Sequence, residues 1–220
     1  MIITFQLGHK LAKADLTKPI DISLETKEKT GFKAWYSPAV TSNVIRGENF
    51  IGSVKEGGSV NFKEVMINPH ANMTHTESVG HISKEEVPVN GVLNRFHFIA
   101  QLISVKPTLM DGNLEKPIQK GDLCILKSAI ENKINPRAEA IIIKTQSNLE
   151  ELKTKNYDGT NWPYLHPKTA AYIREKGIRH LLIDQPSVDK EFDDVMLLYH
   201  RAFWNYPSTL DQYSNITEFI

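Results

Sequence analysis

Three histidines and a glutamate fall within a stretch of twelve residues and could bind a metal ion. They are His70, His75, Glu77 and His81. Neutral imidazole nitrogens and a carboxylate suit zinc, manganese or iron, and such an ion lowers the pKa of bound water to about 7. Two imidazoles and one carboxylate leave positions open for water and substrate, which favours a catalytic site over a structural one. The alternative left open by spacing alone is a set of surface-loop histidines that bind water or backbone groups.

The backbone around this cluster decides which side chains can reach one ion. The segment follows a predicted strand over 59–67 and is expected to be a strand end running into a loop, which excludes a helical His-x-x-x-His zinc site. Residues two apart on an extended chain point to the same side, so His75 and Glu77 can reach one ion together. His70 lies five positions before His75, so it joins them only if a turn or bulge forms near 71–73.

The other elements predict an α/β fold with a mixed sheet. A helix should begin at Pro167 and end near Lys176, where Gly177 suits a left-handed C-cap, and a buried strand should follow over 181–183. A weak helix is predicted over 127–133, and further strands over 21–24, 33–36, 92–105, 124–126, 140–143, 195–199 and 216–220. No segment resembles an interdomain linker, so residues 1–220 are expected to form a single domain.

Two details of these elements concern packing. In the predicted strand over 92–105, Phe96, Phe98, Ala100 and Leu102 fall on one face by period two. The acidic stretch over 189–194 is expected to be a solvated loop. Three tryptophans could stack on an aromatic substrate, although packing is the expected role of each: Trp35, Trp162 and Trp204.

Composition narrows the class of protein. With 40% hydrophobic and 24% charged residues, the chain is not expected to be disordered, fibrous or a coiled coil. No apolar run approaches the roughly 18 residues needed to span a bilayer. Twenty-six basic residues balance 26 acidic ones, so no strongly basic field favours nucleic acid. The one cysteine, Cys124, excludes an intrachain disulfide framework and suits a reducing compartment, and its apolar surroundings predict a buried hydrophobe. A cytoplasmic enzyme or binding protein is expected.

The histidine cluster resembles the HxGTHxDxPxH signature of the bacterial kynurenine formamidases and related "cyclase" metal-dependent hydrolases. The chain has His70, then Thr74–Glu77, then His81, with the family's offset between the last two histidines and its two-residue step from histidine to carboxylate. Glu77 stands where the family has aspartate. Met73 and Val79 stand where glycine and proline are typical.

Two downstream segments extend the resemblance. Gly177–Asp189 is similar to the family's helix–strand–GIDTPSxD element, and Leu198–Ala202 lies where the family has a His-His-Ala stretch, with Arg201 in place of the second histidine. Glu218 looks like the family's later metal-binding glutamate, after which relatives continue with further strands. The resemblance therefore covers most of the chain.

The resemblance implies a site with two divalent metal ions and a swivelling β/β/α fold. One ion would be held by His70, His75 and Glu77, and the other by Glu77, as a bridge, with His200 and Glu218. His81 would be the general acid/base. The ions implied are zinc or manganese, one or two per chain, and relatives' dimers imply a homodimer or higher homo-oligomer.

Three functions fit this pattern. The first is hydrolysis of an amide or formamide carbon–nitrogen bond by metal-activated water, as in kynurenine formamidase (arylformamidase) of tryptophan catabolism. The second is hydrolysis of a different or cyclic amide, such as an isatin-like lactam. The third is a non-catalytic member of the fold that binds a metal or ligand. The expected partner is a small-molecule amide, with no nucleic acid and no membrane.

Overall fold

The computed structural model describes residues 1–112, 114–145 and 148–220, and these form two compact units. The first unit comprises residues 1–23, 76–146 and 161–220, and the second comprises residues 24–75 and 147–160. The prediction of a single domain stays a prediction.

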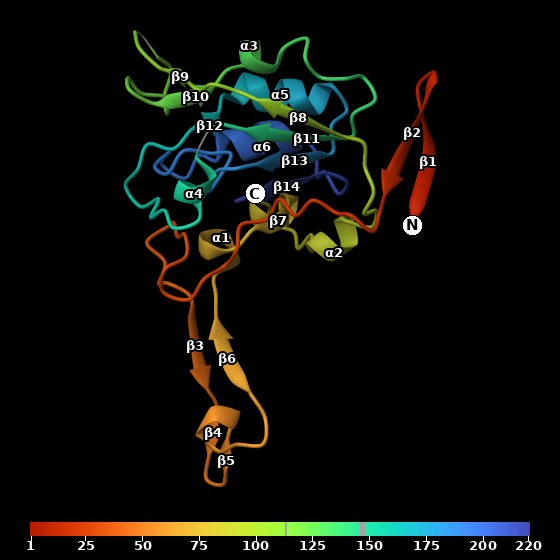
Figure 1. Cartoon of the computed structure of the whole chain (residues 1–220). Coiled ribbons are helices and arrows are strands. Elements are labelled where there is room, and N and C mark those ends of the chain that lie inside the picture. The colour runs from red at the N-terminus through yellow and green to blue at the C-terminus, as the bar shows by residue number, and fades with distance from the viewer. Residues whose placement is uncertain (113, 146–147) are drawn as a thin grey trace. The chain divides into compact units, whose positions relative to one another are not determined.

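A five-stranded sheet forms the centre of the first unit. Its strands follow one another in the order β7 (His75–Ser78), β14 (Asn215–Glu218), β13 (His180–Ile183), β11 (Ala140–Lys144) and β8 (Ala100–Ser104), as Figure 1 shows. The last four strands pair in parallel. Strands β11 and β13 read as nearly continuous apolar runs, which is typical of buried parallel strands.

A second, smaller sheet of the first unit is mixed. Strand β10 (Leu123–Ile125) pairs in parallel with β12 (Tyr164–Leu165) and antiparallel with β9 (Thr108–Leu109). The prediction of an α/β fold with a mixed sheet is therefore confirmed. At the N-terminus, β1 (Ile2–Leu7) and β2 (Lys10–Asp15) form an antiparallel hairpin.

The longer helices of this unit pack on its apolar core. Helix α5 (Pro167–Glu175) begins with proline at its first turn, and Gly177 adopts a φ of +79°, as the sequence predicts. It shares one buried cluster with α6 (Leu198–Trp204), and that cluster includes Ile141, Leu181 and Ile216 of the sheet. Shorter helices are α2 (Val89–Val92), α3 (Lys127–Ile130) and the 3-10 turn Val79–His81.

The second unit contains two small antiparallel sheets and two one-turn helices. Strand β3 (Thr41–Val44) pairs with β6 (Lys63–Met66), and β4 (Arg46–Gly47) pairs with β5 (Phe50–Ile51). Between β5 and β6 lies the 3-10 turn Val54–Glu56. Helices α1 (Pro69–Asn72) and α4 (Leu149–Leu152) complete the unit. Lys33 connects segments 24–75 and 147–160 of this unit, because its ammonium group lies 3.1 Å from the Asp158 carboxylate. Its backbone N–H also donates to the Lys155 carbonyl, and its carbonyl accepts the N–H of Tyr157.

Several strand predictions are wrong in position or extent. No strand forms over 21–24, and over 33–36 only Lys33 makes an isolated bridge. The strand predicted over 59–67 is confined to β6. The strand predicted over 92–105 is confined to β8, where Leu102 is 61% exposed and Ile103 is buried. The predicted apolar face is thus the solvent side, because the residues of opposite parity pack on the core.

The strand predicted over 195–199 is also wrong, because helix α6 begins within it. Leu197, just before the helix, adopts a φ of +47°, and its N–H donates to the Asp193 carboxylate over 2.6 Å. The carboxylate of Asp189 accepts the N–H groups of Tyr199 and His200 in the first helical turn. The two carboxylates thus accept the backbone N–H groups that the first turn of α6 leaves without helical partners. These hydrogen bonds outweigh the strand propensity of the apolar run.

No helix of the described residues combines the length and the apolar character that crossing a bilayer requires.

Candidate metal centre

Two buried carboxylates and an imidazole meet in the first unit. Thr76 and Thr217 hydrogen-bond to each other through their hydroxyls across β7 and β14. The following residues, Glu77 and Glu218, therefore project from the opposite face of the sheet. His200 of α6 meets both: its Nε2 lies 2.7 Å from Glu77 Oε1 and 3.8 Å from Glu218 Oε1. All three residues are at most 5% exposed, so this cluster is shielded from bulk water.

Asp189 fixes the orientation of His200. Its carboxylate accepts a hydrogen bond from His200 Nδ1, and it also holds the first turn of α6 through two backbone N–H groups. Trp162 donates its indole N–H to the backbone carbonyl of Asp189 over 3.0 Å, which anchors the loop. With Nδ1 engaged in this way, Nε2 of His200 faces Glu77 and Glu218. Imidazoles that bind metals usually have this carboxylate partner on the other ring nitrogen.

The electrostatics of this cluster favour a bound cation. Burial and the nearby Glu77 carboxylate raise the pKa of Glu218 well above its ordinary value. Burial alone would lower the pKa of His200, but the carboxylates of Asp189 and Glu77 outweigh it and raise that pKa well above the usual range. Two buried carboxylates that repel each other around one imidazole are a donor set whose charge a divalent cation would offset. The residues therefore fit a divalent metal ion.

His81 lies at the edge of this cluster. It ends the 3-10 turn after β7, and its Nδ1 is 3.5 Å from Glu77 Oε2, while its ring centroid is 5.4 Å from that of His200. The turn is tight at Gly80, where an added Cβ would lie 2.6 Å from the carbonyl oxygen of Val87. The His81 side chain is 32% exposed, so it can exchange protons with water while contacting the buried carboxylate.

The second unit brings the other two predicted ligands together. His70 lies on α1 and His75 begins β7, and their ring centroids are 4.6 Å apart. The turn required between them exists, because α1 reverses the chain and the Asn72 amide ties it to Pro38 and Asn68. His75 Nδ1 donates to the Met73 carbonyl over 3.1 Å, and in that tautomer Nε2 carries the lone pair that a metal ligand requires.

Strand β7 confirms the predicted relation between His75 and Glu77. It runs from His75 to Ser78, so these two residues lie on one strand with a single residue between them and point to the same side. The Ser78 hydroxyl donates to the Val87 carbonyl and accepts the N–H of Gly80, which ends the strand and starts the turn that carries His81.

Sequence reasoning missed Asp189, which was expected in a solvated loop. Asp189 is 1% exposed and Asp193 is 6% exposed, so that expectation is wrong for both. The reason is that their carboxylates bond the backbone at the start of α6. A signal was present: Asp189 occupies the place of the final aspartate in the GIDTPSxD element that the sequence resembles.

Cys124 and two of the tryptophans are packing residues. Cys124 is fully buried, and burial raises the pKa of its thiol to about 11, so it is no nucleophile at neutral pH. Trp162 and Trp204 are at most 2% exposed, and the Trp204 indole packs 5.3 Å from the His200 ring. The indole N–H of Trp204 donates to the Ser214 carbonyl. Neither indole ring is accessible to a substrate, so the predicted packing role of these two tryptophans is confirmed.

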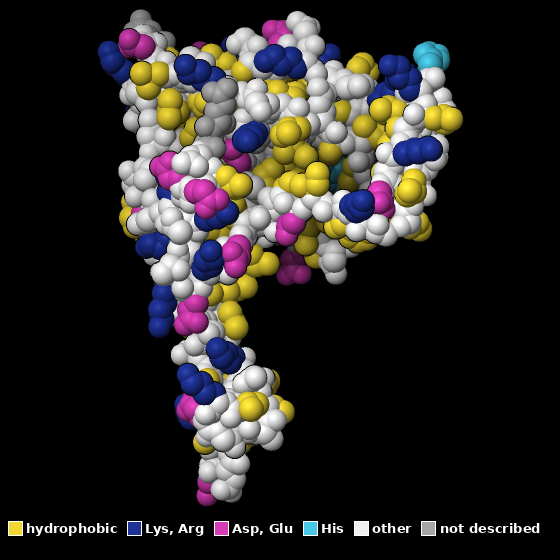
Figure 2. Space-filling model, viewed as in Figure 1, with side chains coloured by type: hydrophobic (Ala, Val, Ile, Leu, Met, Phe, Trp, Pro, Cys, Tyr) yellow, Lys and Arg dark blue, Asp and Glu magenta, His cyan; other side chains and the backbone are white. Residues whose placement is uncertain are grey.

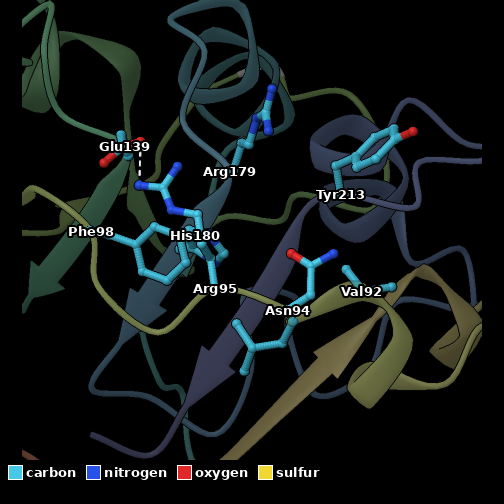
Figure 3. Close-up of a pocket in the computed structure, with 9 residues that line it drawn as sticks. Val92, Asn94, Arg95, Phe98, Glu139, Arg179, His180 and Tyr213 are labelled. Carbon is cyan, nitrogen blue, oxygen red and sulfur yellow. Dashed lines mark hydrogen bonds and ion pairs between the residues drawn. The ribbon is translucent and has the colours of Figure 1, made fainter.

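A separate pocket lies at the other end of the parallel strands. Figure 3 shows Arg95, Phe98, Glu139, His180 and Tyr213 around it. His180 and Glu139 lie at the amino ends of β13 and β11, whereas Glu218 lies at the carboxyl end of β14. The pocket holds about 50 Å³, which is too small for an aromatic amide, since ligand pockets usually exceed about 300 Å³.

Protonation of His180 should weaken the fold. Burial lowers the pKa of His180, which packs against Phe98 and bonds Asn215 through Nδ1. The unfolded chain therefore binds this proton more readily, and the free energy of unfolding should decrease as pH falls below about 6.5. Urea denaturation from pH 7.5 to 5 should show a shallower decrease for His180→Gln than for the wild type. An equal decrease in both would contradict this role.

Comparison with known proteins gives the family. The Cyclase family model matches residues 14–190. The chain belongs to the cyclase family. No curated protein matches it significantly.

Solved structures of similar fold include proteins described as predicted or potential metal-dependent hydrolases. A predicted metal-dependent hydrolase from Bacillus stearothermophilus has 12% identity and a TM-score of 0.50, with 82% of this chain and 71% of that one covered. A potential metal-dependent hydrolase with cyclase activity has 13% identity and a TM-score of 0.54, over 90% and 80% of the two chains. Isatin hydrolase A from Labrenzia aggregata, bound to benzyl benzoate, has 13% identity and a TM-score of 0.53, over 90% and 79%. At these identities the likeness concerns the fold.

Proposed function

We propose that this cyclase-family protein is a metal-dependent hydrolase that cleaves the carbon–nitrogen bond of an amide. The observation that carries the proposal is the buried Asp189–His200–Glu77 chain, with Glu218 beside it. Such a cluster adds nothing to a hydrophobic core, because burying paired carboxylates costs free energy that packing alone does not return. A bound cation would offset the negative charge of these buried carboxylates and so account for their presence.

The proposed ligands form two sets that share Glu77. His70, His75 and Glu77 would hold one ion, and Glu77, His200 and Glu218 would hold a second. The alternation of β7 supports the first set, and the Asp189 carboxylate behind His200 supports the second. The ions proposed are zinc or manganese, which imidazole and carboxylate ligands suit.

The protein groups have distinct roles in hydrolysis. A bound divalent cation would lower the pKa of a water molecule toward neutrality and would polarise the carbonyl of the substrate. His81 takes the proton of the attacking water and returns it to the departing nitrogen, since imidazole exchanges protons near neutral pH. The exposed edge of His81 opens toward solvent, while its Nδ1 contacts Glu77, which keeps the ring directed at the cluster.

Two substrate classes remain as candidates. The first is a linear aryl formamide such as N-formylkynurenine, which the sequence signature indicates. The second is a cyclic amide such as isatin, favoured by Glu77, Met73 and Val79, which depart from the formamidase signature, and by a neighbouring fold that is an isatin hydrolase. We also propose that the protein acts in the cytoplasm, which its single, buried cysteine suits. As a further proposal, it works as a homodimer or a higher homo-oligomer.

The test is turnover of both substrates with and without metal. We expect the protein loaded with zinc or manganese to hydrolyse N-formylkynurenine or isatin, and chelation followed by desalting to abolish that turnover. Adding back the ion should restore it. Turnover that survives complete metal removal would overturn the metal dependence. No turnover of either amide by a metal-loaded protein would favour the non-catalytic alternative.

A further inference from the structure

Two hollows adjoin at the amino ends of the parallel strands. The small pocket, of about 50 Å³, is the one described above, and it shares Val92, Asn94 and Tyr213 with a large hollow of about 250 Å³. All residues that line either of them belong to the first unit. A cavity of about 150 Å³ can hold benzene, so the large hollow has room for one aromatic ring. The small pocket can then take a polar group attached to that ring.

Apolar side chains form much of the wall of the large hollow. Val87, Pro88 and Val92 line it together with Tyr213, which is 68% exposed, so most of that ring is open to a ligand. Gly91 of α2 also lines the hollow and places no side chain in it. Apolar walls with a few polar groups are typical of small-molecule sites. The large hollow therefore suits an aromatic ring.

The charged side chains of the small pocket leave one guanidinium without a carboxylate. Arg95 is neutralised by Glu139, whose Oε1 accepts a hydrogen bond from Arg95 Nη2 over 2.7 Å (Figure 3). Arg179 has no carboxylate at ion-pairing distance in the described part of the chain, and its guanidinium carbon lies 5.9 Å from the Tyr213 ring centroid. Burial lowers the pKa of His180, so this imidazole is neutral at pH 7. The small pocket thus carries one uncompensated positive charge.

Backbone hydrogen bonds fix the position of Arg179. Its N–H donates to the Glu139 carbonyl over 2.9 Å, and its carbonyl accepts the N–H of Asn215 over 2.9 Å. These bonds tie Arg179 to the starts of β11 and β14 on either side of β13. A charged group on a backbone that is already ordered loses less conformational freedom when a ligand binds.

Charge and shape together indicate the class of ligand. A guanidinium binds a carboxylate through two parallel hydrogen bonds. Glu86 lines only the large hollow, so it would repel an anionic group there and favours a carboxylate beside Arg179. Figure 2 shows basic and acidic side chains interspersed over the visible face, with no extended basic patch that would attract a large polyanion. The ligand indicated is a small anion with a single carboxylate and one ring.

We propose that the small pocket and the large hollow form a second ligand site, which binds a small aromatic carboxylate. The carboxylate pairs with Arg179, and the ring lies against Tyr213 and Val87. The site is distinct from the metal centre, because Asn215 and Glu218 are at opposite ends of β14, about 10 Å apart along the strand. Hydrolysis of a cyclic aryl amide would release an anion of the same class, but binding at this site requires neither that reaction nor a metal ion.

Benzoate is the probe, and isothermal titration calorimetry of the metal-loaded protein measures its binding. Arg179→Gln should raise the dissociation constant at least about tenfold, equivalent to about 1.4 kcal/mol. Arg137→Gln removes an exposed guanidinium of the same unit that lies outside both hollows, so it should bind benzoate as the wild type does. No binding to the wild type at about 10 mM benzoate, unchanged affinity in Arg179→Gln, or an equal loss in Arg137→Gln would overturn the proposal.

A third variant separates this site from the metal centre. A carboxylate can also bind a divalent ion, so Glu77→Gln, in which metal should be lost, is titrated alongside. It should bind benzoate with the affinity of the wild type. Loss of binding in Glu77→Gln would place benzoate at the metal centre and overturn the second site. The metal content of Glu77→Gln tests the proposed function separately.

The ring and the charge are tested independently of Arg179. An added Cβ at Gly91 would meet only Pro88 Cγ, at 3.9 Å, so Gly91→Leu should fold and fill the large hollow. Its affinity for benzoate should fall at least about tenfold. Benzyl alcohol has the same ring without the charge and should bind the wild type at least about tenfold more weakly than benzoate does. Benzoate affinity that is unchanged in Gly91→Leu, or matched by benzyl alcohol in the wild type, would refute the site.

Discussion

Glu77→Gln is expected to lose the bound divalent ions and almost all hydrolysis. Glu77 is 5% exposed, contacts both His200 and His81, and belongs to both proposed ligand sets. An amide keeps the shape of the side chain but removes the charge that balances a cation. Because a metal contributes several kcal/mol to such reactions, kcat should fall at least about a thousandfold. Metal content per chain and kcat are measured on the same preparation.

Two further variants make this result specific. Glu77→Asp restores the carboxylate that the family signature has at this position, so it should retain metal and part of the activity. Glu175→Gln neutralises an exposed carboxylate at the end of α5 and should match the wild type. Full metal content in Glu77→Gln would show that Glu77 is no ligand. Loss of metal in Glu175→Gln would show that the effect is not local.

His81→Ala should separate proton transfer from metal binding. Since His81 lies beside the cluster and is not in either proposed ligand set, the variant should keep its metal. General acid–base catalysis typically contributes about 10²–10⁴-fold, so kcat should fall by that factor while metal content stays constant. The dependence of kcat on pH should also differ from that of the wild type, because the group proposed to transfer the proton is gone.

The outcome that contradicts this role is equally clear. If His81→Ala loses metal together with activity, His81 is a ligand. If it keeps full activity with the wild-type pH profile, another group transfers the proton. Either result would leave the test of Glu77 intact, because that variant reports on metal content directly.

The sequence predicted those elements whose ends or faces are set by neighbouring residues along the chain. Pro167 and Gly177 bound helix α5, and the apolar run after Gly177 forms β13. Alternation along β7 places His75 and Glu77 on one side, because a strand has a fixed period whatever surrounds it.

Features that depend on distant partners could not be predicted in the same way. Helix α6 replaces a predicted strand because Asp189 and Asp193 accept its first N–H groups, and their burial is a property of the folded chain. The buried face of β8 is opposite to the apolar pattern, because Ile103 packs on the core while Leu102 faces solvent. For the candidate site, the ligand types were readable from residue spacing and family resemblance, whereas the Asp189 carboxylate behind His200 became evident from the structure.

The most direct test of the metal centre is the metal content of the wild-type protein, purified without chelator and measured by inductively coupled plasma mass spectrometry. We expect one or two zinc or manganese ions per chain, a value that Glu77→Gln reduces to traces. A wild-type protein that stays free of divalent ions, even after dialysis against zinc and manganese salts, would contradict a metal centre formed by these residues.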